Sequence, residues 1–231
     1  MTTDPPDDEE FSSFASPPCF LHEFEAADLA RNLEDWRKAE RSRLIAGRLG
    51  VDADRRMLWA GRIAAQLDAV IGDLNGLMIS VYWPFRGEPD LRPWMKTVAD
   101  RGGHCALPVV VERGRPLVFR SWAEGEALER GIWNIPIPAA GSDVLPDVVI
   151  APVVGFDDAC YRLGYGGGYF DRTLASLHRK PRILGVGYSL QRIPTIRPQP
   201  HDVPMDAIVT EALIHRRRRM GPAVEGQSIP R

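Results

Sequence analysis

The sequence is poor in cysteine, in long apolar runs and in net charge. Its three cysteines, Cys19, Cys105 and Cys160, are widely spaced and form no CxxC pair, which disfavours a disulfide framework or a structural zinc site. No apolar run reaches the length of a membrane span, and no signal-peptide pattern opens the chain, so we expect a cytoplasmic protein without a membrane partner. The net charge of -2 gives no general attraction to nucleic acid, and we expect no nucleic-acid partner.

The composition is that of an ordinary globular protein. The 231 residues are 44% hydrophobic and 26% charged, which allows one sizeable α/β domain. Residues 1–24 are acidic and broken by proline, and residues 215–231 are basic, so both are predicted to be flexible tails around a domain of residues 25–214. The arginine run at 216–219 could touch nucleic acid, but a solvated tail with no specific partner is the favoured interpretation.

Helical and strand patterns alternate along the chain. Helices are expected at 25–49, 53–71 (with Asp52 as N-cap), 91–100 and 169–178, and strands at 77–82, 104–111, 116–122, 148–154, 182–188 and 207–210. Residues 104–122 should form a hairpin, whereas proline makes 123–146 irregular. This order predicts a single three-layer α/β/α domain with a mostly parallel, Rossmann-like sheet. The loops at 84–90, 155–171 and 188–206 should share the rim where such sheets bind ligands.

One glycine-rich segment stands out, the stretch RLGYGGGYFDR from Arg162 to Arg172. Glycines before a helix N-terminus leave backbone N–H groups available for phosphate. Arg162 can pair with phosphate, and Asp171 can bind a hard cation. The segment fits neither GxxxxGK[ST] nor GxGxxG. A glycine-rich turn with no ligand is the simpler alternative.

Basic residues also gather on the first helix. Arg37, Arg41 and Arg48 fall on one helical face, and Lys38 lies one step round it. This face could be a rim for anions above the glycine loop, or a solvated surface.

Several motifs together resemble one family. The glycine segment with Gly155-Phe156-Asp157 is the most specific of them. Shorter matches are Tyr82-Trp83-Pro84 with Arg86-Gly87-Glu88, the segment 133–136 with Pro138, and the block from Gly185 to Glu211. Over Trp36 to Glu211 the chain resembles 5-formyltetrahydrofolate cyclo-ligase, also called methenyltetrahydrofolate synthetase.

The resemblance implies an enzyme of one-carbon metabolism that uses ATP and Mg²⁺ to convert 5-formyltetrahydrofolate to 5,10-methenyltetrahydrofolate, with release of ADP and phosphate. It implies catalytic roles for Arg162, Tyr169 and Asp171, and magnesium binding by Asp171 and Asp206. It implies a folate site of Tyr82, Glu88, Trp133 and Tyr169. The implied ATP contacts are Arg37, Lys38, Arg41, Arg162, Leu163, Gly164, Tyr165, Gly166, Gly167, Gly168, Tyr169 and Phe170.

Structural roles remain open for some of these residues. Tyr82 and Trp133 could be core residues, Asp206 could belong to a turn or cap, and Asp171 could be a helix N-terminal charge. The chain also departs from the family, with Arg37 where a lysine is usual and Ile137 where many bacterial members carry glutamate. A related ATP-using enzyme acting on another acyl or pterin-like substrate is therefore the alternative function. We expect a monomer or weak homodimer.

Overall fold

The computed structural model describes residues 21–217, with side chains described from residue 28 onward. The chain divides into two compact units, residues 1–36 and 37–231, and the boundary falls within helix α1 (Leu21–Leu49). The predicted domain of residues 25–214 therefore spans this boundary. The sheet and the cavity described below belong to the second unit.

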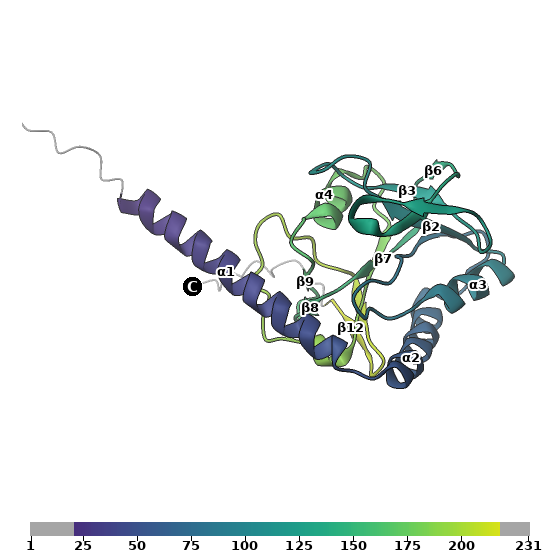
Figure 1. Ribbon diagram of the computed structural model, residues 1–231, viewed down its shortest axis with the longest axis horizontal. Coiled ribbons are helices and arrows are strands. Elements are labelled where there is room, and N and C mark those ends of the chain that lie inside the picture. Colours follow the sequence, from purple (N-terminus) through teal and green to yellow (C-terminus); the bar gives the residue numbers. More distant parts are fainter. Residues whose placement is uncertain (1–20, 218–231) are drawn as a thin grey trace, which may run out of the picture. The chain divides into compact units, whose positions relative to one another are not determined.

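An eight-stranded, mostly parallel sheet forms the second unit (Figure 1). Its order is β12-β11-β10-β7-β1-β2-β3-β6, and the five strands from β11 to β2 are parallel, with antiparallel strands at both edges. The strands are β1 (Met78–Ser80), β2 (His104–Val109), β3 (Val118–Ser121), β6 (Asp143–Val144), β7 (Val148–Pro152), β10 (Arg182–Val186), β11 (Ala207–Val209) and β12 (Ile214–Arg216). The predicted β2–β3 hairpin and the central position of β7 are confirmed.

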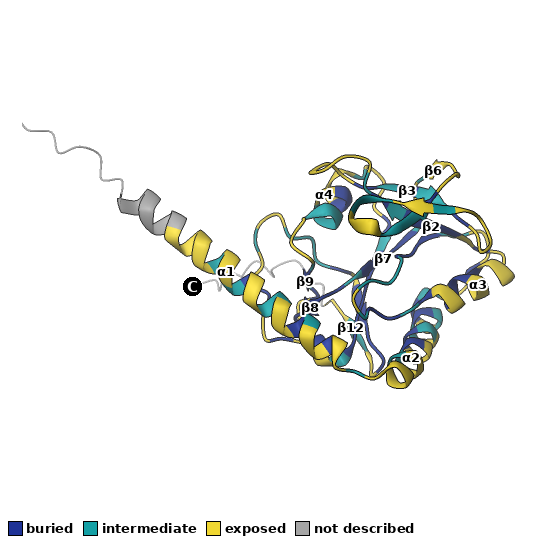
Figure 2. Cartoon of the chain, viewed as in Figure 1, coloured by how far each residue is buried: buried dark blue, intermediate teal, exposed yellow. Residues whose placement is uncertain are grey.

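Helices cover both faces of this sheet. In β7, Val148 and Ile150 pack into one core with α2 (Ala53–Ile71) and α3 (Arg92–Asp100). Val149 and Ala151 pack into a second core with Leu174 of α4 (Tyr169–Ser176). Because side chains of a strand alternate between its faces, a strand buried on both sides is apolar throughout. Figure 2 shows the central strands buried and the outer surfaces of α2 and α3 exposed. The predicted three-layer α/β/α class is confirmed.

Local signals explain where α2 begins and ends. The Asp52 carboxylate accepts a hydrogen bond from the Arg55 N–H at 2.8 Å, as an N-cap does. Gly72 ends the helix with a φ of 89°, which glycine adopts without strain. Both bounds match the predicted range.

Two other regions differ from the prediction. The stretch expected to be irregular contains a two-stranded ribbon of β4 (Leu128–Arg130) and β5 (Pro136–Pro138), joined through a 3-10 turn at Ile132–Asn134. Proline is tolerated because β5 pairs on one side only. At the other end, β12 includes residues 215 and 216, which had been placed in the C-terminal tail. Residues 21–24, which had been placed in the N-terminal tail, are the first residues of α1. Residues 1–20 and 218–231 of the predicted tails lie outside the described residues.

Candidate active site

A cavity of about 640 Å³ lies at the carboxyl end of the parallel strands. The loop after β1 supplies Glu88, the segment after β7 supplies residues 162–171, and the loop after β10 supplies Asp202. These are the three loops expected to share one rim. The volume lies within the range of small-molecule sites. Basic side chains and aromatic rings line it, and the main ones are Arg37, Arg41, Tyr82, Trp83, Phe85, Arg86, Trp133, Arg162, Tyr165 and Tyr169.

The glycine loop follows the small ribbon of β8 (Gly155–Phe156) and β9 (Arg162–Leu163) and leads into α4. Gly166 has a φ of 97°, and a Cβ there would lie 3.3 Å from the Arg41 guanidinium carbon. No side chain caps α4. Within the described residues, the N–H groups of residues 165–168 have no acceptor in the protein. These donors and the positive helix end face the cavity, which suits an anion.

Two arginine–carboxylate pairs lie beside this loop. Arg162 donates from Nη2 to Asp171 Oδ2 at 3.0 Å, and Arg37 donates to Asp202 at 2.5 Å and to the Arg197 carbonyl at 2.7 Å. Both arginines are buried, and the Nε atom of each is buried without a hydrogen-bond partner. A buried donor without an acceptor is costly in a folded protein. Both guanidiniums therefore retain capacity for a ligand anion.

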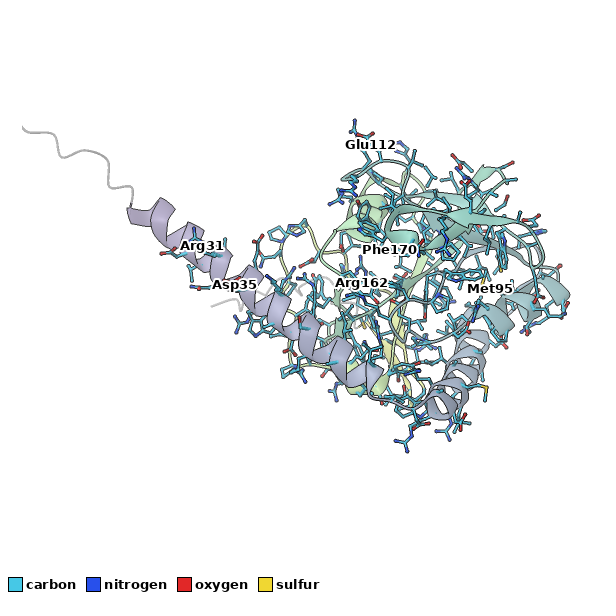
Figure 3. All side chains as sticks on the ribbon, viewed as in Figure 1. Arg31, Asp35, Met95, Glu112, Arg162 and Phe170 are labelled. Atoms are coloured by element: carbon cyan, nitrogen blue, oxygen red, sulfur yellow. The ribbon has the colours of Figure 1, made fainter. Side chains whose placement is uncertain are left out.

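These pairs also shape the ionisation of their members. Burial lowers the pKa of the Arg162 guanidinium, an effect that the charges of Asp171 and Asp202 oppose. Burial disfavours ionised Asp202 as well, but hydrogen bonds from Arg37 and from the Gln199 N–H hold its pKa below the ordinary value. The Arg162 guanidinium also lies over the Phe170 ring, 5.3 Å from its centroid (Figure 3). Asp171 and Asp202 are thus close enough to act on the same guanidinium.

Glu88 contacts the glycine loop through Tyr165 and is 5% exposed. Its Oε1 accepts a hydrogen bond from the Tyr165 hydroxyl at 2.8 Å, and its Oε2 accepts one from the Phe85 N–H at 2.8 Å. Burial raises the pKa of Glu88 to about 7, and Arg48 and the two hydrogen bonds oppose that rise. Glu88 is a carboxyl group whose charge changes near neutral pH.

The aromatic residues of the cavity have different degrees of exposure. Tyr82 is 3% exposed and donates its hydroxyl to the Pro89 carbonyl at 2.9 Å, so it is both a core residue and part of the lining. Trp133 is 53% exposed, which excludes the core role. Its ring meets Tyr169 edge to face, with 5.4 Å between centroids. The Tyr169 hydroxyl in turn accepts the Gly114 N–H at 3.3 Å.

The structure brings most of the predicted site residues together, with two exceptions. Lys38 is exposed and does not line the cavity, whereas Arg37 does. Asp206 lies at the amino end of β11, where its Oδ2 accepts the Ile183 N–H at 2.7 Å. Parallel strands have their amino ends at one edge, so Asp206 is at the edge away from the glycine loop. Asp206 therefore does not lie with Asp171 in the lining of the cavity, and its carboxylate makes a structural hydrogen bond instead.

The predicted site left out Asp202 and Arg86, which line the cavity, and Arg48, which holds the lining residue Tyr165. Asp202 and Asp206 lie in one segment, HDVPMD. The path of this loop in three dimensions decides which of the two carboxylates reaches the cavity. Arg48 had a signal in the sequence, its place on the same helical face as Arg37 and Arg41. Arg86 had one too, next to Gly87 and Glu88 in a loop that the sequence placed at the rim. A buried charge is not visible in a sequence when exposed charges are the norm.

The fold and the cavity define an α/β protein with an arginine-lined cavity at the carboxyl ends of its strands, where proteins of this architecture bind small molecules. The sequence profile described as the 5-formyltetrahydrofolate cyclo-ligase family matches residues 33–211. The chain therefore belongs to this family, as the motifs indicated.

Individual relatives agree. The chain is 32% identical over 144 residues to the 5-formyltetrahydrofolate cyclo-ligase of Escherichia coli K12, covering 59% of this chain and 79% of the relative. It is 28% identical over 158 residues to that of Mycolicibacterium smegmatis, covering 63% and 81%. The NMR structure of Aquifex aeolicus 5,10-methenyltetrahydrofolate synthetase matches with a TM-score of 0.70 and 26% identity, covering 84% of this chain and 96% of that one.

Two further properties concern what the described residues do not contain. Among residues 21–217, no helix is both long and apolar enough to cross a membrane. In the same part of the chain, no three His, Cys, Asp or Glu side chains cluster as a metal site.

Proposed function

We propose that this chain is a 5-formyltetrahydrofolate cyclo-ligase that converts 5-formyltetrahydrofolate to 5,10-methenyltetrahydrofolate at the expense of ATP, releasing ADP and phosphate. Family membership supports the activity. The observation that carries it is the glycine loop with free N–H donors, which lies between two buried arginines and a buried carboxyl group in one cavity.

The ATP phosphates would bind between the glycine loop and α1. The N–H groups of residues 165–168 would contact phosphate oxygens. Arg37, Arg41 and Arg162 would neutralise their charge. Arg41 donates to the Gly164 carbonyl at 2.8 Å, which fixes its guanidinium against the loop. Phosphoryl transfer depends mainly on positioning and charge stabilisation, which this arrangement supplies.

Two carboxylates suit a magnesium ion here. Mg²⁺ in ATP sites is commonly held by one or two carboxylates together with phosphate oxygens, so a cluster of three protein ligands is not required. Asp171 and Asp202 both line the cavity, and each pairs with an arginine. We propose that they would hold Mg²⁺, which would supply charge neutralisation between the phosphates. Arg162 and Arg37 would then turn from the carboxylates to the phosphates.

The reduced folate would bind at the other end of the cavity. Ionised Glu88 can accept N–H bonds from the amino-pyrimidine edge of a pterin, since each of its oxygens retains a second lone pair. Trp133 and Tyr169 form an aromatic wall near the mouth, and Tyr82 closes the inner side. The formyl group would then lie toward the glycine loop and the γ-phosphate.

The chemistry proceeds in two steps in this site. The formyl oxygen attacks the γ-phosphorus, and ADP leaves. Nitrogen 10 then attacks the activated formyl carbon, the carbon–oxygen bond breaks, phosphate departs and nitrogen 10 loses its proton. Arg162, which pairs with Asp171, would stabilise the charge that develops on the transferred phosphoryl group.

A related enzyme acting on another acyl or pterin-like substrate remains the alternative, and Ile137 favours it. Ile137 lines the cavity where many bacterial members carry glutamate. ADP release can be measured with 5-formyltetrahydrofolate, with 10-formyltetrahydrofolate and with unsubstituted tetrahydrofolate. The proposal expects release with the first compound only. Release with another compound and not the first would favour the alternative.

The surroundings of the protein are proposed on simpler grounds. We propose a cytoplasmic location, because Cys105 and Cys160 are free thiols and the cytoplasm is reducing. We further propose a monomer or weak homodimer, which light scattering across a concentration series would test.

A further inference from the structure

Arg48 is a fully buried arginine near the end of α1, with 0% exposure. Its Nε donates to the Arg86 carbonyl at 2.9 Å, its Nη1 to the Val153 carbonyl at 3.4 Å, and its Nη2 to the Tyr165 hydroxyl at 2.6 Å. These acceptors belong to the loop after β1, to the residue that follows β7 and to the glycine loop. Burial of a guanidinium is costly, and hydrogen bonds from its donors offset that cost. Arg48 therefore fixes three segments relative to one another.

The Tyr165 hydroxyl has one hydrogen, and this fixes the direction of the network. It accepts from Arg48, so its own hydrogen is free to go to Glu88 Oε1, 2.8 Å away. Burial raises the pKa of Tyr165, which keeps the phenol protonated as a donor. With the Phe85 N–H on Oε2, both oxygens of Glu88 are held in place.

Tyr165 also belongs to the glycine loop through its backbone. Its N–H is one of the donors without an acceptor in the protein, and the next residue, Gly166, has a positive φ. Its ring packs against Phe85, with 5.8 Å between centroids. One residue thus carries a phosphate donor on its main chain and holds Glu88 with its side chain.

We propose that Arg48 and Tyr165 are positioning residues for Glu88, and that Tyr165 couples occupancy of the glycine loop to binding of the reduced pterin. This inference rests on the proposed function. An anion on the loop would order the Tyr165 backbone and, with it, the hydroxyl that orients Glu88. Each substrate then binds more tightly when the other is present, by the same factor, because coupling free energy is reciprocal.

The test measures binding of 5-formyltetrahydrofolate by calorimetry, with and without a non-hydrolysable ATP analogue and Mg²⁺. In the wild type, the analogue should lower the folate Kd at least about fivefold, a typical coupling. Tyr165→Phe keeps the ring and the loop but removes the hydroxyl. It should raise the folate Kd about 10-fold or more, since the lost hydrogen bond is to a charged group. It should bring the coupling factor close to 1, while the Kd for the analogue alone stays within about twofold.

A second variant and a control distinguish loss of the positioning contacts from a general loss of folded structure. Arg48→Met should weaken folate binding in the same direction. Arg43→Met is the matched control on the same helix, because Arg43 is exposed and pairs only with Glu40 among the described residues. It should leave both Kd values unchanged.

The outcomes separate this inference from the proposed function. If the wild type forms methenyl product but folded Tyr165→Phe keeps the folate Kd and the coupling of the wild type, the coupling role is rejected and the function stands. If the wild type binds no reduced folate, both are rejected.

Discussion

Arg162 and Asp171 form a buried ion pair, with 3.0 Å between Nη2 and Oδ2 and side-chain exposures of 4% and 13%. The second oxygen of Asp171 accepts the Val203 N–H at 3.1 Å. In the proposed function, Asp171 would be both the partner of a phosphate-binding arginine and a ligand of the metal ion. Only the metal role should make the effect of substituting Asp171 depend on the magnesium concentration.

We predict that Asp171→Asn lowers turnover strongly, and most at limiting Mg²⁺, because the amide retains the shape but loses the charge. Asp202→Asn should change the magnesium dependence in the same way. Asp206→Asn is the control, since Asp206 lies at the other edge of the sheet. Initial rates across a magnesium titration measure all three. A wild-type magnesium profile in both Asp171→Asn and Asp202→Asn would exclude the metal role.

The two neighbouring cations of α1 should behave differently. Arg37→Ala should raise the KM for ATP, since Arg37 lines the cavity and has an unsatisfied Nε. Lys38→Ala should have nearly wild-type kinetics, because exposed charges contribute little. Steady-state kinetics at saturating folate test this pair. The reverse pattern would mean that the nucleotide lies on a different face of the helix.

The free energy of unfolding should depend on pH through Glu88, whose pKa is raised from 4.5 to about 7. Between these values the folded carboxyl keeps a proton that the unfolded chain has released. Its contribution to the unfolding free energy therefore falls as the pH rises from about 4.5 to about 7. The charged and titratable groups that face it are Arg48, Tyr165, Tyr82 and Tyr188.

Glu88→Gln should remove this component. The stability difference between wild type and variant should decline by on the order of 3 kcal/mol across the window. Urea unfolding of both proteins at several pH values measures it. Parallel pH profiles would show that Glu88 titrates normally.

Trp133→Ala should weaken folate binding without unfolding the protein. Its ring is 53% exposed and packs edge to face on Tyr169. Loss of an aromatic contact costs about 0.5–1.5 kcal/mol, or roughly 2- to 12-fold in Kd. Exposed substitutions change stability by only about 0.5 kcal/mol. Trp133→Phe should retain most of the affinity. Unchanged affinity in the alanine variant would remove Trp133 from the site.

Local signals made much of the fold predictable. The cap at Asp52 fixes the start of α2, and the apolar run at Val148–Pro152 forms β7. Both signals lie within a few residues of sequence, and both elements were placed correctly. The β4–β5 ribbon was missed because proline excludes a central strand but not a two-stranded ribbon. Its existence depends on pairing across the chain.

The site was predictable where one segment carried the chemistry. Residues 162–171 and Glu88 reach one cavity because strand ends of a parallel sheet share an edge. The sequence placed Asp206 at this edge and left Asp202 out, whereas Asp202 lines the cavity and Asp206 does not. Four residues of loop path decide which edge each carboxylate reaches. The burial of Arg48 could not be predicted either, since its partners come from three separate loops.

The central claim is that this chain forms a methenyl bridge from a formyl group at the expense of ATP. The direct measurement is the absorbance of 5,10-methenyltetrahydrofolate on mixing the purified chain with 5-formyltetrahydrofolate, ATP and Mg²⁺, with ADP quantified in the same reaction. The account predicts methenyl product and ADP in equal amounts, and neither when ATP or the formyl compound is omitted. ADP release without methenyl product, or no reaction of the folded protein, would contradict it.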